Sequence, residues 1–123
     1  MSTPDAMTVL VVDDDRAFLD MVSAAFVEEG HRVLAAVDGK TGLDLARRSS
    51  PDVILLDVLM AGMDGPAFAH AYASMPGPHA PIIVVSGALP AQAARVEEAA
   101  AFLGKPFELD ELMGVVREVT AQA

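Results

Sequence analysis

Carboxylate, hydroxyl and ammonium groups stand at the ends of short apolar runs along this chain of 123 residues. The groups that could do chemistry together are Asp13, Asp14, Asp57, Ser86 and Lys105. Three carboxylates packed together cannot all ionise cheaply unless a cation neutralises them. Mg²⁺ solves this, because it takes oxygen ligands and is usually held by one or two carboxylates together with phosphate. The residue types therefore predict a site that binds Mg²⁺ and a phosphoryl group.

Each remaining group has a chemical task at such a site. Lys105 is a compact point charge suited to a phosphoryl oxygen, and the Ser86 hydroxyl can donate a hydrogen bond to another oxygen. Asp57 is left as a carboxylate nucleophile, a known use of this group in phosphoryl transfer. Positioning and charge neutralisation do most of the catalysis in such reactions. Taken singly, these residues have blander interpretations as strand-end turn or solvated loop residues, and only their combination favours chemistry.

The elements that must position these groups are predicted from apolar periodicity. Strands are expected over residues 8–12, 32–37, 53–56, 81–85 and 101–103, and helices over 16–29, 40–48, 64–75, 90–100 and 109–119. Strict alternation of strand and helix indicates an α/β fold, a doubly wound five-stranded parallel sheet with five helices. The carboxyl ends of its strands meet at one edge, where ligands bind. That edge would collect all the polar groups named above.

The motifs at these strand ends resemble those of the receiver domain of two-component response regulators. They are residues 11–15 (VVDDD), 56–65 (LDVLMAGMDG), 85–87 (VSG) and 105–107 (KPF). The resemblance implies a flavodoxin-like, CheY-like fold with strand order 2-1-3-4-5. We expect one receiver domain over residues 8–121, preceded by a disordered leader at 1–7.

The resemblance also implies a role for each acidic residue. Asp57 would accept a phosphoryl group from the phosphohistidine of a sensor histidine kinase or phosphotransfer protein. Asp14 and Asp57 would ligate Mg²⁺, with the backbone carbonyl of Leu59, and Asp13 would act through water. The domain would catalyse its own phosphorylation and dephosphorylation without being a conventional enzyme.

A conformational relay is implied as well. Ser86 and Lys105 would bind the phosphoryl group, and Phe102 matches the aromatic switch position. The signal would reach an output domain or downstream protein on the face formed by helix 90–100, strand 101–103 and the last helix. The kinase, the pathway and the output are open, as is whether the chain is a stand-alone regulator or part of a longer one.

Helix 90–100 departs most from the resemblance. Its side chains are mostly alanine, with Val96 as the only large aliphatic one, and no glycine closes it. Alanine favours helix but buries little apolar area. The segment between Ser86 and Lys105 also looks a few residues short. We therefore expect this helix to be weakly docked and to order or shift on phosphorylation.

Composition narrows the function classes. The net charge of −10 disfavours binding of nucleic acid, and no apolar run is long enough to span a membrane. The absence of cysteine excludes disulfides and thiolate sites, and we expect a cytoplasmic protein. The alternatives are a receiver-like interaction module that is never phosphorylated, a flavodoxin-like cofactor binder and a haloacid-dehalogenase-like phosphatase. Asp13, Asp14 and Asp15 after the first strand would repel a phosphate, which disfavours the flavodoxin-like cofactor binder. They also lack the DxD motif followed by Gly-Thr that the phosphatase would need.

Overall fold

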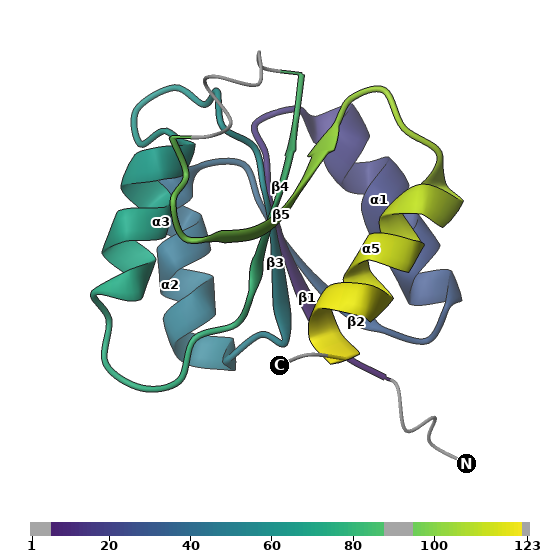
Figure 1. The fold of residues 1–123 in the computed structure, drawn as a ribbon, viewed down its shortest axis with the longest axis horizontal. Helices are drawn as coiled ribbons and strands as arrows, with labels where there is room; N and C mark the ends of the chain where they lie inside the picture. Colours follow the sequence, from purple (N-terminus) through teal and green to yellow (C-terminus); the bar gives the residue numbers. More distant parts are fainter. Residues whose placement is uncertain (1–5, 88–94, 122–123) are drawn as a thin grey trace.

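The chain forms a five-stranded parallel sheet between two layers of helices (Figure 1), as the alternation of elements predicts. The computed structural model describes residues 6–87 and 95–121. The strands are β1 (Thr8–Val12), β2 (Arg32–Ala36), β3 (Val53–Leu56), β4 (Ile82–Ser86) and β5 (Ala99–Gly104). The helices are α1 (Arg16–Glu28), α2 (Gly39–Ser49), α3 (Gly65–Ala73) and α5 (Leu109–Ala121). The strand order is β2-β1-β3-β4-β5, which confirms the predicted topology.

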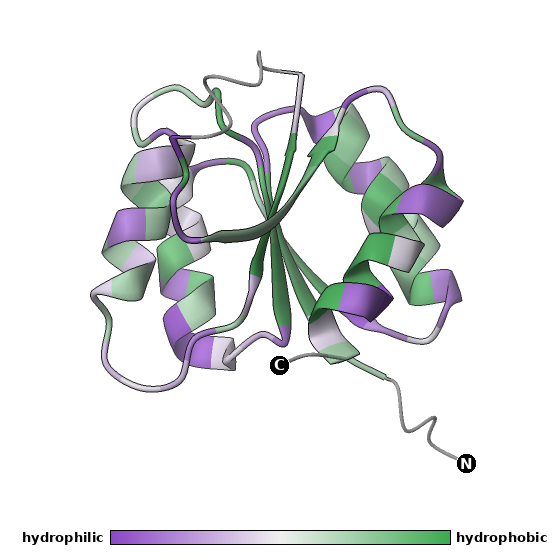
Figure 2. Ribbon diagram, in the orientation of Figure 1, coloured by the Kyte–Doolittle hydropathy of each residue, from purple (hydrophilic) through white to green (hydrophobic). Residues whose placement is uncertain are grey.

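The central strand β3 is buried on both faces, and its four residues are 0% exposed. Val53 and Leu55 pack under α1 and α5, whereas Ile54 and Leu56 pack on the other side with α2 and α3. Figure 2 shows the matching pattern, with apolar strands in the middle and the polar stripes of the helices outside. Side chains alternate between the faces of a strand, so a continuous apolar run feeds two separate cores. This arrangement fixes where β3 ends and where the residue after it must stand.

Local caps set the helix boundaries. Asp15 is the N-cap of α1, and its carboxylate accepts hydrogen bonds from the backbone of Ala17 and Phe18. Asp64 caps α3 in the same way, with proline in the first turn, as its sequence predicts. Gly30 follows the end of α1 with φ 93°, a left-handed conformation that glycine adopts without strain.

The predicted helix 90–100 is wrong over the part that the structure describes. Residues 88–94 lie outside the described residues. From 95 to 98 the chain is turn and irregular, and β5 begins at Ala99, earlier than predicted. The structure therefore has four helices within its described residues, where we expected five. Alanine's helix preference is well under 1 kcal/mol per residue relative to other ordinary residues, and here pairing with β4 outweighs it.

Val96 anchors this turn, since it is 1% exposed and packs in the core beneath α2 and α3. The Ala99 backbone N–H donates to the Val96 carbonyl and closes the turn. Of the helix 90–100 that we expected to order on phosphorylation, residues 90–94 lie outside the described part of the chain, and residues 95–100 form the turn and the start of β5.

At the N-terminal side, residues 1–5 of the expected leader also lie outside the described residues. Met7 is paired: its N–H donates to Nδ1 of His31, and its carbonyl accepts from the Arg32 N–H. Among the helices that the structure describes, none has the length and apolarity needed to cross a membrane.

Candidate functional site

Three residues of the candidate site stand one position past a strand, each held by a backbone hydrogen bond to the neighbouring strand. Asp13 N–H donates to the carbonyl of Ala36, and Asp57 N–H donates to that of Val12, both at 3.0 Å. Lys105 N–H donates to the carbonyl of Ser86, also at 3.0 Å. The sheet ladder thus continues one step into the site, so the positions of these residues follow from the pairing of the strands.

The acidic cluster that we predicted is assembled. Asp13, Asp14 and Asp57 can each offer a carboxylate oxygen such that all three lie within 4.8 Å of one another. Asp13 and Asp57 are buried, and Asp14 is exposed. This donor set of oxygens alone, with one side open to solvent, fits a hard dication such as Mg²⁺.

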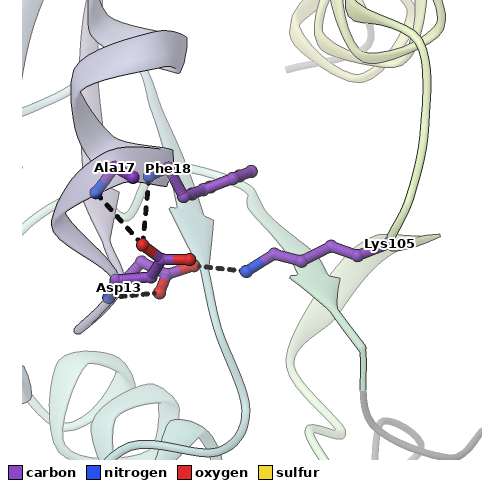
Figure 3. Close-up of polar contacts among 5 residues, drawn as sticks. Asp13, Ala17, Phe18 and Lys105 are labelled. Atoms are coloured by element: carbon purple, nitrogen blue, oxygen red, sulfur yellow. Dashed lines mark hydrogen bonds and ion pairs between the residues drawn. The ribbon is translucent and has the colours of Figure 1, made fainter.

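Both oxygens of the Asp13 carboxylate have partners within the protein. Its Oδ1 accepts from the Asp15 N–H at 2.9 Å, and its Oδ2 pairs with the Lys105 ammonium at 2.7 Å. Figure 3 shows Lys105 reaching across the edge of the sheet to Asp13, beside the first turn of α1. The side chain of Asp13 is 1% exposed and that of Lys105 is 24% exposed. Each oxygen of this buried carboxylate is thus fixed by one contact within the protein.

The pKa of Asp57 is raised above its ordinary value. Burial is the first cause, and the negative charge of Asp13 is the second. The positive charge of Lys105, the hydroxyl of Ser86 and a hydrogen bond from the Val58 backbone act in the opposite direction but do not cancel the rise. The folded protein therefore holds an ionised Asp57 at a cost, which a cation or a covalent phosphoryl group would change.

This cost predicts a pH-dependent effect of Asp57→Asn on stability in the presence of a chelator. Since the pKa of the folded state lies above that of the unfolded state, wild-type stability falls as pH rises through this interval. Asn carries no charge, so the variant should be more stable than wild type at neutral pH. The difference should vanish below pH 3.8, the ordinary Asp pKa. Urea unfolding at pH 3 and pH 7 measures it, and equal gains at both pH values would contradict it.

The loop after Asp57 is held against the start of α3 by a close backbone approach at Gly65. Its N–H donates to the Val58 carbonyl at 2.8 Å. A Cβ at this position would lie 2.7 Å from Cα of Val58 and 2.9 Å from the carbonyl oxygen of Asp57. Backbone atoms cannot move aside as a flexible side chain can, so only glycine fits here without shifting Asp57.

Gly65→Ala should therefore lower the free energy of unfolding by about 1–3 kcal/mol, the usual cost of overpacking. Gly114→Ala in α5 is the matched control, because nothing lies within 4 Å of its added Cβ. A helix-interior glycine so replaced should gain about 0.5–1 kcal/mol. Urea denaturation of both variants checks the pair, and equal effects at the two positions would refute the close-approach argument.

The other predicted residues lie as follows. Ser86 is buried at the end of β4. A hydrogen bond from its side chain lowers the pKa of Asp57. The side chain of Leu59 points largely to solvent and is 55% exposed. Phe102 is 52% exposed on β5 and is therefore not a core residue.

Three features of the site were missed from sequence. They are the pairing of Lys105 with Asp13, the ring of Phe18 beneath the ammonium and the close approach at Gly65. A signal did exist for Phe18, because the Asp15 cap places it in the first turn of α1, next to the acidic residues.

A doubly wound parallel sheet in the order β2-β1-β3-β4-β5, with an acidic cluster at its carboxyl edge, defines a class of flavodoxin-like α/β domains. The family model for the response regulator receiver domain matches residues 9–117. The chain belongs to that family, whose members are receiver modules of two-component signalling.

Known relatives agree with this assignment. The response regulator PleD of Caulobacter vibrioides is 37% identical over 117 residues, which cover 91% of this chain and 26% of PleD. The probable transcriptional regulatory protein TcrX of Mycobacterium tuberculosis is 35% identical over 111 residues, 87% of this chain and 47% of TcrX. The chain thus spans about a quarter of PleD and about half of TcrX.

Solved structures show the same fold. A CheY-like receiver domain protein from Methanospirillum hungatei superposes with a TM-score of 0.86 at 25% identity, covering 96% of each chain. The chemotaxis protein CheY4 of Vibrio cholerae superposes with a TM-score of 0.82 at 29% identity, covering 93% of this chain and 98% of that one.

Proposed function

We propose that this domain is a phosphorylation-dependent switch that accepts a phosphoryl group on Asp57 from the phosphohistidine of a sensor histidine kinase or phosphotransfer protein. One observation carries the proposal: a buried carboxylate with a raised pKa stands among two further carboxylates and a lysine, at the carboxyl edge of the sheet. A cytoplasmic location is part of the same proposal, because it is supported by membership of a two-component family.

The metal ligands that we propose are Asp14, Asp57 and the Leu59 carbonyl, with Asp13 reached through water. Mg²⁺ bound there would neutralise the charge of the carboxylates and of the incoming phosphoryl oxygens. One oxygen of Asp13 accepts from the Asp15 N–H and the other pairs with Lys105, and these two contacts support its indirect role at the metal.

The chemical step is an in-line displacement at phosphorus. A carboxylate oxygen of Asp57 forms the new P–O bond while the P–N bond of the donor phosphohistidine breaks, and the departing imidazole takes up a proton. Lys105 and Ser86 stabilise the negative charge on the transferring oxygens. Attack of water on the phosphorus of the acyl phosphate later returns the Asp57 carboxylate and inorganic phosphate.

The conformational relay that we propose runs from Ser86 to Phe102. Phe102 pairs in register with Val84 on the neighbouring strand, two residues before Ser86. Side chains two apart share a face of a strand, so Phe102 and Ser86 lie on the same side of adjacent strands. A phosphoryl group on Asp57 would draw the Ser86 hydroxyl inward and leave space for the exposed Phe102 ring.

The output surface that we propose includes β5 and α5. Phe102 lines a small open groove between these two elements, together with Ala101, Val115 and Val119. A downstream protein or output domain that contacts this groove would sense the position of the Phe102 ring.

The direct test of the proposed function is phosphorylation by acetyl phosphate in the presence of Mg²⁺, followed by intact-mass measurement. The protein should gain one phosphoryl group, and an excess of chelator should prevent the gain. No mass increase at any Mg²⁺ concentration would refute the proposal and favour the alternative, a receiver-like interaction module that is never phosphorylated.

Metal binding gives a separate prediction, because a ligand that binds only the folded state raises its stability. Mg²⁺ without phosphate should raise the melting temperature of wild type and leave that of Asp14→Ala nearly unchanged. Asp20→Ala, at an exposed position on α1, is the control and should respond as wild type does. A full response in Asp14→Ala would remove this residue from the proposed ligand set.

A further inference from the structure

Lys105 is held from two sides, by a carboxylate and by an aromatic ring. Its ammonium nitrogen lies 2.7 Å from Oδ2 of Asp13 and 4.0 Å from the centroid of the Phe18 ring. A cation this close to a ring face is attracted by the ring's negative quadrupole, and the attraction grows as water is excluded. Phe18 is 8% exposed and the Lys105 side chain 24% exposed, so little water screens the contact.

The Phe18 ring is itself fixed in place. Its backbone N–H donates to the Asp15 carboxylate in the first turn of α1, which Figure 3 shows beside Lys105. Its ring also meets that of Phe107 edge to face, with centroids 6.0 Å apart and planes at 90°. Phe107 follows Lys105 by two residues, so the loop after β5 contacts Phe18 through both side chains.

We propose that Phe18 is a positioning residue that holds the Lys105 ammonium at the pocket while its anionic partner changes. The inference rests on the proposed function. During phosphoryl transfer the lysine must leave Asp13 and turn to a phosphoryl oxygen on Asp57. A lysine side chain has a flexible four-carbon stem. Without a further contact it would lose rotamer freedom once on pairing with Asp13 and again on pairing with the phosphoryl oxygen. A cation–π contact has no fixed direction around the ring axis, so it can persist as the ammonium moves between the two oxygens.

The alternative role for Phe18 is simple core packing, because the ring also belongs to the cluster beneath α1 and α5. Truncation cannot separate the two roles, since it would leave a cavity. Fluorination can: fluorine withdraws electron density from the ring face and weakens cation–π attraction while the shape of the ring is nearly kept.

The experiment places 4-fluoro-, 3,5-difluoro- and 3,4,5-trifluorophenylalanine at position 18 and measures the rate of phosphorylation by acetyl phosphate at saturating Mg²⁺. The rate should fall stepwise with the number of fluorines, by roughly threefold to tenfold for the trifluoro ring. The same series at Phe26, a fully buried ring further along α1, is the control and should leave the rate unchanged. A flat series at position 18, or an equal fall at both positions, would overturn the proposal.

A second measurement separates this inference from the proposed function. The midpoint of urea unfolding without metal should fall along the position 18 series in wild type, and should stay constant along it when Lys105→Met is present. If wild type is not phosphorylated at all, the proposed function fails and the positioning role fails with it. The comparison of unfolding midpoints with and without Lys105→Met still reports whether the ring and the ammonium attract each other. If wild type is phosphorylated but the unfolding midpoints change equally along the position 18 series with and without Lys105→Met, only the inference about Phe18 fails.

Discussion

Asp57→Asn should gain no phosphoryl group under conditions in which wild type gains one. The amide has no nucleophilic oxygen of comparable strength, and no other carboxylate of the cluster is placed as Asp57 is, at the end of the central strand and beside Ser86. The expected result is complete loss of the mass increase after incubation with acetyl phosphate and Mg²⁺. Intact-mass measurement checks it, and peptide mapping of wild type should place the phosphoryl group on Asp57.

The matched control is Asp52→Asn. Asp52 precedes the opposite end of the same strand, where its carboxylate accepts a hydrogen bond from the Thr8 N–H at 2.8 Å. Asn can still accept that bond, so the variant should fold and be phosphorylated as wild type is. Equal labelling of Asp57→Asn and wild type would show that the phosphoacceptor lies elsewhere, and loss of labelling in both variants would show a general effect on folding.

Lys105→Met should have the second large effect, on stability and on rate together. It would leave the carboxylate of Asp13 buried without its cation, and removal of one partner from a buried ion pair typically costs about 3–5 kcal/mol. The 24% exposure of the lysine places the expectation at the lower end, roughly 3 kcal/mol. Urea unfolding in chelator measures this loss.

Phosphorylation of Lys105→Met should also be slow, since the positive charge proposed to meet the phosphoryl oxygens is gone. Mg²⁺ should restore part of the lost stability, because it neutralises the same carboxylates, but should not restore the rate. Lys40→Met removes an exposed lysine at the start of α2 and is the matched control. If Lys105→Met were as stable and as readily phosphorylated as Lys40→Met, the ion pair would be irrelevant to both properties.

Much of this molecule follows from short-range patterns in its sequence. The apolar run Val53–Leu56, bounded by turn signals, predicts a strand buried on both faces, and the structure confirms it. Asp15 and Asp64 begin helices because a carboxylate satisfies backbone N–H groups that no helical carbonyl can reach. Alternation of strand and helix then leads to a parallel sheet, whose geometry gathers Asp13, Asp57 and Lys105 at one edge. The acidic cluster was predictable for this reason.

Other features were decided by contacts between segments far apart in the chain. Residues 99–100 have the composition of a helix, yet they belong to β5, where Ala99 pairs with Ile82 of β4, because ladder hydrogen bonds outweigh a small intrinsic preference. The pairing of Lys105 with Asp13 spans 92 positions, and the need for glycine at position 65 arises only where α3 meets the backbone after β3. From the sequence, Phe18 is predicted to be an ordinary core residue of α1. Only in the folded protein does the loop after β5 place the Lys105 ammonium over the face of its ring. Local sequence sets which residues can react, whereas packing between distant segments sets which charges and rings surround them.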